Sequence, residues 1–213
     1  MKYTSFIFDL DGTLVRTDPE YRHLVVGKIL EELGVSASEK DIDRFWFEGE
    51  RNSFIRERFG VNPKTFWELY RKYESVELRR KYVSPYPDVD VLERIKENGY
   101  RTGIVTGAPP EIAKMELELL GPENFDAVIV TTVSENVKSK PHPHGIELCL
   151  KSLSTDKGEA VYIGNSDEDV LAAKNAGVLD VFINRNEHPF DLNRLKPSLV
   201  IETLYELEQR FKL

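Results

Sequence analysis

The chain has 213 residues, 40% of them hydrophobic and 31% charged, which is enough to bury the core of one domain with an insertion and excludes a disordered chain. The net charge of −8 disfavours nucleic acid as the main partner, because an acidic surface repels a phosphate backbone. The longest apolar runs have four residues, so no membrane span is predicted, and the single cysteine excludes an internal disulfide. No signal peptide is visible, and we expect a cytoplasmic protein.

The first predicted element is a strand over residues 4–8. Residues 16–84 then read as an all-helical insertion without strands. Asp18 followed by Pro19 is typical of a helix start, and Ser38 and Asn62 can cap two further helices. Apolar residues recur at helical spacing through all three segments, and the third helix is predicted to reach residue 76.

From residue 86 onward, short apolar runs alternate with amphipathic stretches. Strands are predicted over 101–106, 126–131, 159–164, 179–183 and 198–201. Helices are predicted over about 88–98, 109–120, 143–152, 167–176 and 202–211. This alternation indicates a doubly wound parallel α/β sheet made of residues 1–15 and 85–213, interrupted by the helical insertion over 16–84.

Polar residues follow the predicted strands. Asp9 and Asp11 come after the first strand, Thr106 ends the second, and a loop after the third leads to Lys140. The fourth strand ends in the acidic segment 164–169. Ligands of open parallel sheets bind beyond the carboxyl ends of the strands, so these groups are predicted to share one edge of the sheet. Each group alone is explained equally well as a turn, a helix cap or a solvated charge.

Four motifs together resemble those of the haloacid dehalogenase superfamily. They are Asp9-Leu10-Asp11-Gly12-Thr13, Thr106, Lys140-Pro141-His142-Pro143, and Gly164-Asn165-Ser166-Asp167-Glu168-Asp169. The third has the form found in the phosphoglycolate phosphatase and β-phosphoglucomutase branch. The helical insertion after the first motif resembles the cap of that branch. The resemblance covers nearly the whole chain.

The resemblance implies a Mg²⁺-dependent phosphatase that acts on a small phosphorylated metabolite. Asp9 would attack phosphorus to form an aspartyl-phosphate, and Asp11 would serve as general acid and then general base. Thr106 and the Gly107 amide would bind phosphoryl oxygens, and Lys140 would neutralise the charge of the transition state.

The resemblance also implies that Asp9, Asp11, Asn165 and Asp169 form the Mg²⁺ site, with Asp169 orienting a metal-bound water and Lys140. Asn165 departs from the family pattern, which usually has Asp at this position. An amide oxygen can bind Mg²⁺, but the site loses a full negative charge, so weaker metal binding is expected.

In the cap, Arg51 and His23 are candidates for contact with the substrate, although a solvated charged face explains Arg51 equally well. No motif identifies the substrate or the oligomeric state.

Two alternative functions stay open. One is a non-catalytic family member that binds a phosphorylated ligand or a protein partner, for which Asn165 is the argument. The other is a phosphoglucomutase-like phosphotransferase, which shares every motif. A dehalogenase is disfavoured, because the position of Asp11 is typically not acidic in that branch.

Overall fold

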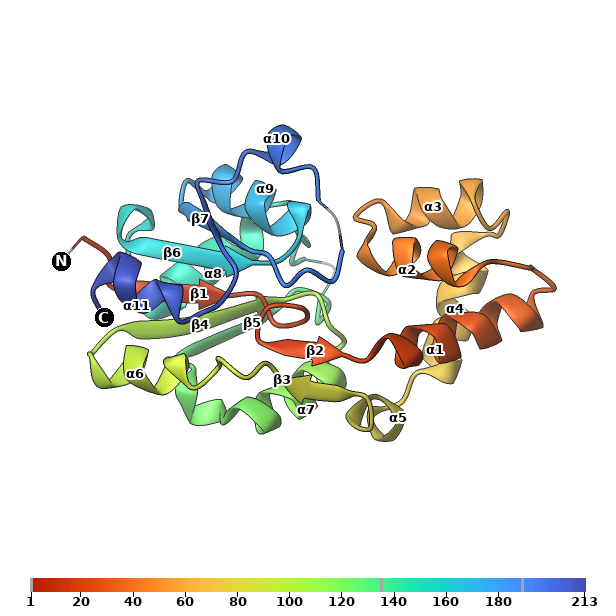
Figure 1. Ribbon diagram of the computed structural model, residues 1–213, viewed down its shortest axis with the longest axis horizontal. Coiled ribbons are helices and arrows are strands. Elements are labelled where there is room, and N and C mark those ends of the chain that lie inside the picture. The colour runs from red at the N-terminus through yellow and green to blue at the C-terminus, as the bar shows by residue number, and fades with distance from the viewer. Residues whose placement is uncertain (1, 135, 189) are drawn as a thin grey trace. The chain divides into compact units, whose positions relative to one another are not determined.

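The computed structural model describes residues 2–134, 136–188 and 190–213 (Figure 1). The chain forms two compact units. One contains the residues up to Arg16 together with Ser84–Leu213, and the other is Thr17–Val83. In the described residues, no helix is long and apolar enough to cross a membrane.

The larger unit contains a six-stranded sheet in the order β5-β4-β1-β6-β7-β8, and every neighbouring pair is parallel. The strands are β1 (Ser5–Phe8), β4 (Arg101–Thr106), β5 (Ala127–Val130), β6 (Ala160–Gly164), β7 (Leu179–Ile183) and β8 (Leu199–Ile201). The predicted parallel α/β sheet with a helical insertion after the first strand is therefore confirmed. Because β1 lies between β4 and β6, the residues that follow these three strands end side by side.

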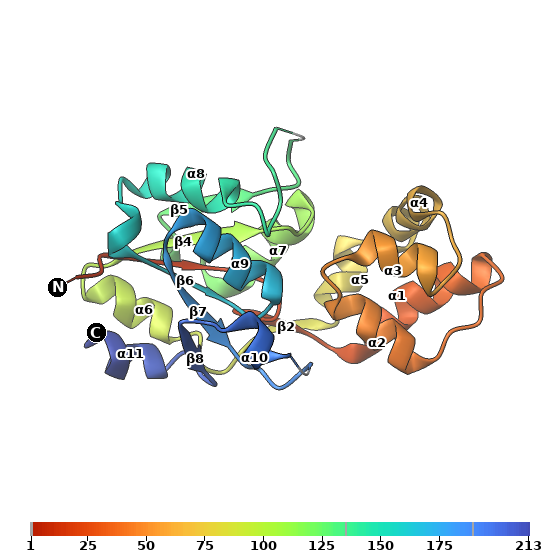
Figure 2. The same ribbon diagram turned by 90° about the horizontal axis from the view of Figure 1, so that it is seen from above.

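Helices cover both faces of this sheet. They are α6 (Val91–Glu97), α7 (Pro110–Leu120), α8 (His144–Leu153), α9 (Asp167–Ala176), α10 (Leu192–Leu195) and α11 (Glu206–Phe211), with short 3-10 turns at Pro122–Asn124 and Lys157–Glu159. Figures 1 and 2 show α8 and α9 on one face, and α6, α7 and α11 on the other. Ile7 packs in the cluster with α8 and α9, whereas the ring of Phe6 contacts Tyr100 and Phe211, as expected for alternating side chains of a strand.

The smaller unit is helical, with α1 (Pro19–Glu32), α2 (Glu39–Phe47), α3 (Arg51–Glu57), α4 (Pro63–Tyr73) and α5 (Val76–Arg80). Its predicted helix starts are confirmed, since the side chains of Asp18, Ser38 and Asn62 each accept a hydrogen bond from the first turn. The core is aromatic, with Phe45 in ring contact with Phe54, Phe59, Phe66 and Trp67.

Two details of the smaller unit correct the sequence prediction. The helix that begins at Pro63 ends at Tyr73 rather than reaching residue 76, because Ser75 accepts a hydrogen bond from the Leu78 amide and starts α5. The short helix α3 was also not predicted.

The expectation of an insertion without strands is wrong at its two ends. β2 (Val15–Thr17) and β3 (Val83–Pro85) pair in a two-stranded sheet where the chain leaves and re-enters the larger unit. Each strand has three residues, which is too short to produce a recognisable alternation of polar and apolar residues.

The packing of β4 against α8 gives a test of the fold. A Cβ at Gly103 would lie 2.5 Å from Cys149 Sγ and 3.2 Å from Leu153 Cδ1. We expect Gly103→Ala to lower the free energy of unfolding by about 1–3 kcal/mol, because the interior has no room for a methyl group. Gly158→Ala is the matched control, since a Cβ there meets nothing within 4 Å.

Thermal and urea unfolding of Gly103→Ala, Cys149→Ala and the double variant would measure the effect. Removal of the sulfur should relieve the clash, so the double variant should be more stable than the sum of the single effects by about 1 kcal/mol. Strict additivity would contradict the packing account.

Candidate active site

A tight turn after β1 carries the first motif. The Asp9 amide donates to the Ile163 carbonyl of β6 over 2.9 Å, which fixes Asp9 at the end of the strand. The Leu10 carbonyl then accepts from the amides of Leu14 and Val15, over 2.9 and 3.1 Å, and so closes the turn. Gly12 lies inside this turn at φ +76°, and a Cβ there would be 2.1 Å from Nδ2 of Asn165. Glycine is required here for both reasons.

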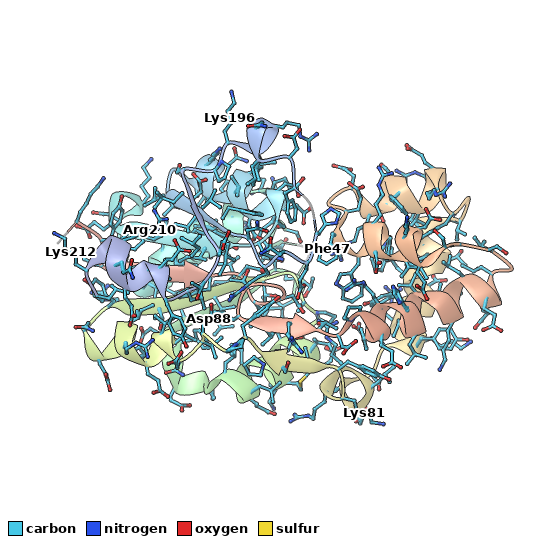
Figure 3. The ribbon with its side chains drawn as sticks, in the orientation of Figure 1. Phe47, Lys81, Asp88, Lys196, Arg210 and Lys212 are labelled. Atoms are coloured by element: carbon cyan, nitrogen blue, oxygen red, sulfur yellow. The ribbon has the colours of Figure 1, made fainter. Side chains whose placement is uncertain are left out.

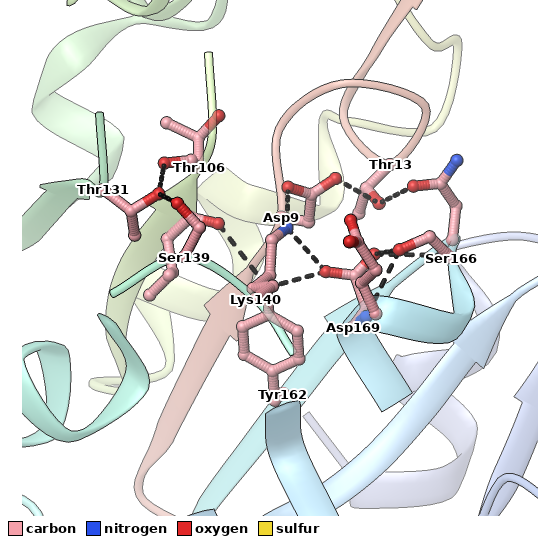
Figure 4. Close-up of polar contacts among 12 residues, drawn as sticks. Asp9, Thr13, Thr106, Thr131, Ser139, Lys140, Tyr162, Ser166 and Asp169 are labelled. Carbon is pink, nitrogen blue, oxygen red and sulfur yellow. Dashed lines mark hydrogen bonds and ion pairs between the residues drawn. The ribbon is translucent and has the colours of Figure 1, made fainter. Parts of the chain in front are cut away.

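Lys140 lies between two buried carboxylates (Figure 4). Its Nζ is 2.6 Å from Oδ1 of Asp9 and 2.7 Å from Oδ1 of Asp169. Asp9 is 5% exposed and Asp169 is 1% exposed, so solvent screens these interactions weakly. Three residues from three predicted motifs are thereby brought together.

Asp169 is held by two residues that the sequence analysis did not single out. Ser166 donates to its Oδ2 through the amide over 3.0 Å and through the hydroxyl over 2.6 Å, and Tyr162 donates to its Oδ1 over 2.9 Å. The spacing of Ser166 and Asp169 is that of a helix capping box, which could have been recognised in the sequence. Tyr162 carries no such signal. Asp169 was predicted as a metal ligand, but in this structure its oxygens accept from Lys140, Tyr162 and Ser166.

Burial and neighbouring charges shift the pKa values of Asp9 and Lys140. Burial raises the pKa of Asp9 to about 7, although Lys140 acts against this rise, and the charges of Asp169 and Asp11 add to it. Burial acts to lower the pKa of Lys140, but the charges of Asp169 and Asp9 outweigh it and hold this pKa well above its usual value. Lys140 is therefore charged at neutral pH, whereas full ionisation of Asp9 calls for further positive charge.

Two oxygen acceptors, one from Asp9 and one from Asn165, share a single hydroxyl donor. The Thr13 hydroxyl lies 3.5 Å from Oδ2 of Asp9 and 3.3 Å from Oδ1 of Asn165, and its single proton can serve only one of them. Carboxylate and amide oxygens are ligands that Mg²⁺ accepts, so the donor set fits this ion. Within the described parts of the chain, no group of three or more His, Cys, Asp or Glu side chains is arranged as a metal site.

Thr106 lies at the end of β4, the neighbour of β1, and is drawn with the site in Figure 4. Its hydroxyl accepts from the Ala108 amide over 3.1 Å, and its carbonyl accepts from the amide and the hydroxyl of Thr131. A Cβ at Gly107 would have only Thr131 Oγ1 nearby, at 4.0 Å. The predicted phosphate-binding turn is thus at the same edge of the sheet as Asp9.

Arg51 and His23 belong to the smaller unit, where each has a partner. The Arg51 guanidinium donates to the carbonyls of Trp46 and Glu48 at the end of α2. His23 Nε2 is 2.8 Å from Oδ1 of Asp43. These contacts stabilise the helical unit, and a role of Arg51 and His23 in substrate binding stays a prediction.

Comparison with known proteins identifies the family. The sequence model of the haloacid dehalogenase-like hydrolase family matches residues 6–183 of this chain. The chain belongs to this family. The resemblance drawn from the four motifs is therefore confirmed, and the protein is a hydrolase.

Relatives of known name are pyrophosphatases and a phosphatase. A protein of Caldanaerobacter subterraneus subsp. tengcongensis, provisionally named pyrophosphatase PpaX, is 32% identical over 97% of this chain and 94% of its own. The pyrophosphatase PpaX of Halalkalibacterium halodurans is 30% identical over 97% of this chain and 96% of its own. Among solved structures, a HAD phosphatase from Thermococcus onnurineus is 29% identical with a TM-score of 0.73, covering 99% of this chain and 98% of its own.

The raised pKa of Asp9 predicts a pH dependence of stability in the metal-free hydrolase. Between pH 3.8 and about 7, the folded state keeps a proton on Asp9 that the unfolded state has already released. The free energy of unfolding should therefore fall as the pH rises through this window. Asp9→Asn removes the titrating group. Its free energy of unfolding at pH 8 should exceed that of the wild type by about 1 kcal/mol or more, and the difference should shrink toward pH 4.

Urea unfolding in EDTA at pH 4.5, 6 and 8 would check this prediction. Equal stability of the two proteins at pH 8 would show that the Asp9 carboxylate is not penalised by its burial.

Proposed function

We propose that this hydrolase is a Mg²⁺-dependent phosphatase that hydrolyses a small phosphorylated metabolite through an aspartyl-phosphate on Asp9. The observation that carries the proposal is the contact of Lys140 with both Asp9 and Asp169, at the edge of the sheet where the family motifs meet. The names of the relatives, which are pyrophosphatases and a phosphatase, point to the same class of reaction. The cytoplasmic setting expected from the sequence is part of the proposal.

The first step is attack of an Asp9 oxygen on phosphorus. A new O–P bond forms as the bond to the leaving group breaks, and Asp11 gives its proton to the departing oxygen. Lys140 supplies positive charge where negative charge grows, and it needs no reorganisation because Asp169 already holds it. Thr106 and the Gly107 amide would bind the phosphoryl oxygens.

In the second step, water attacks the phosphorus of the aspartyl-phosphate and Asp11 takes the proton that water loses. The bond between Asp9 and phosphorus breaks, so inorganic phosphate leaves and the carboxylate is restored. Asp11 thus alternates between its acid and its base form, which requires that its side chain stay beside the phosphoryl group throughout the cycle.

Mg²⁺ would be held by Asp9, Asn165 and the carbonyl of Asp11, and Asp169 would act chiefly through Lys140. When bound, the ion would supply the positive charge that lets a carboxylate approach an anionic phosphoryl group. Such a charge is what the high pKa of Asp9 calls for in the metal-free protein.

The substrate is to be found by measuring phosphate release from a panel that contains pyrophosphate, phosphoglycolate, sugar phosphates and nucleotides, with and without Mg²⁺. Pyrophosphate is tested first in this panel, because the curated relatives are named pyrophosphatases. Release that depends on Mg²⁺ would support the proposal. No release from any compound would favour the alternative of a non-catalytic family member.

The nucleophile is tested by Asp9→Asn, which should abolish Mg²⁺-dependent hydrolysis of p-nitrophenyl phosphate while leaving the far-UV circular dichroism unchanged, because an amide does not attack phosphorus. Asp191→Asn is the matched control. It removes the carboxylate that caps α10 in the same unit, and its activity should equal that of the wild type. Retained turnover in Asp9→Asn would remove Asp9 from this role.

The proposed contact of Asn165 with Mg²⁺ predicts how substitutions at this position change the affinity for the ion. Asn165→Asp adds a negative charge beside Asp9, so the Mg²⁺ concentration for half-maximal activity should fall about tenfold. Asn165→Ala removes the oxygen and should raise that concentration. A Mg²⁺ titration of the three proteins at fixed substrate measures both effects, and an unchanged value in Asn165→Asp would contradict a metal contact at this position.

A further inference from the structure

A buried arginine outside the family motifs contacts the loop that carries Asp11. Arg185 follows β7, and its side chain is 7% exposed. One terminal nitrogen donates to the Thr13 carbonyl over 2.6 Å. The Thr13 hydroxyl, on the other side of the same residue, is the group that contacts Asp9 and Asn165. Arg185 therefore does not contact Asp9 directly but is linked to it through Thr13, in the turn after β1.

The guanidinium is fixed from its other side by Asp88, which lies between β3 and α6 and is labelled in Figure 3. The pair is bidentate, with N···O distances of 2.7 and 3.0 Å. Asp88 also accepts from the Thr203 hydroxyl over 2.9 Å and from the Leu204 amide over 2.8 Å. Burial acts to raise the pKa of Asp88, but the hydrogen bonds from Arg185 and Leu204 outweigh it and lower this pKa.

Tyr86 completes the arrangement. The guanidinium carbon of Arg185 lies 3.9 Å from the centre of the Tyr86 ring, at the distance of a cation–π contact. The Tyr86 amide donates to the Leu14 carbonyl over 3.0 Å. The turn is thus held at two successive carbonyls, those of Thr13 and Leu14, by the guanidinium and by the residue on which the guanidinium stacks.

We propose that Arg185 is a positioning residue that holds the turn of Asp11, Gly12 and Thr13 in place for proton transfer to the leaving group and from the attacking water. The inference rests on the proposed function. Only the planar fork of an arginine can satisfy both oxygens of Asp88 and the Thr13 carbonyl at once. A lysine would keep the charge opposite Asp88 but would lose part of this set of bonds.

A contribution to folding stability does not by itself explain the ion pair of Arg185 and Asp88. A buried ion pair costs much of its attraction in desolvation, and apolar residues of similar volume often replace such pairs without loss. Nε of Arg185 is also buried without a hydrogen-bond partner in the described structure. Burying Arg185 and Asp88 therefore costs free energy. A role in holding the turn in place explains why the pair is present.

The order of the turn can be measured without any activity. Hydrogen exchange of the amides of residues 12–15, which donate within the turn, should be about tenfold faster in Arg185→Lys and Arg185→Gln than in the wild type, in the metal-free protein. Arg94→Gln is the matched control. Arg94 pairs with Asp90 and Glu208 and stacks on Tyr205, and in the described ranges of the chain no bond joins it to the turn.

The catalytic consequence is read from two substrates. Loss of proton donation should lower kcat/KM for an alkyl phosphate by about ten- to a hundredfold, because this ratio covers only the steps up to the aspartyl-phosphate and an alkoxide leaves poorly without a proton. For p-nitrophenyl phosphate, whose leaving group needs no proton, kcat/KM should fall by less than about threefold. A role confined to stability would lower both rates equally and in proportion to the loss of Tm.

Unchanged exchange of the turn in both Arg185 variants, or equal losses of kcat/KM on the two substrates, would overturn the inference. Arg185→Lys guards against a folding defect, because it keeps the charge that Asp88 requires. If the wild type released phosphate from no compound, the proposed function would fail, and the exchange measurement would still decide whether Arg185 holds the turn.

Discussion

Lys140 places one positive charge between two carboxylates that are almost completely buried, and the rest of the site depends on this contact. Without the ammonium group, Asp9 and Asp169 would face each other as like charges in a poorly screened interior. With it, three segments that follow different strands meet at one nitrogen atom. Asp169 in turn is oriented by Ser166 at the start of α9 and by Tyr162 of β6. These two contacts fix the carboxylate that holds Lys140.

Glycines make this close arrangement possible. A Cβ at Gly164 would lie 2.3 Å from Cγ of Asp169, and a Cβ at Gly12 would overlap the amide of Asn165. The acidic and amide side chains of the fourth motif therefore lie directly against backbone that has no side chain. Oδ2 of Asp9 and Oδ1 of Asn165 therefore share the single proton of the Thr13 hydroxyl, and both oxygens are ligands that a hard cation accepts.

Sequence reasoning located the sheet and the residues at its edge because both are encoded locally. Apolar runs that end in Asp9 or Thr106 predict strand ends, and the parallel order brings those ends together. Arg185 could not be found this way, because its partners Asp88 and Thr13 are distant in the chain and none of the three bonds follows a short motif. Strands β2 and β3 could not be predicted for a different reason. Each has three residues, which is too few to show an alternation of polar and apolar side chains.

The central claim is that the carboxylate of Asp9 forms a covalent bond to phosphorus, and trapping that bond tests it most directly. Borohydride reduces an acyl phosphate to an alcohol and leaves a free carboxylate unchanged. Enzyme quenched during turnover with Mg²⁺ and substrate, then reduced and digested, should contain homoserine at position 9, and enzyme without substrate should not. Steady phosphate release with Asp9 intact in every peptide would contradict the account.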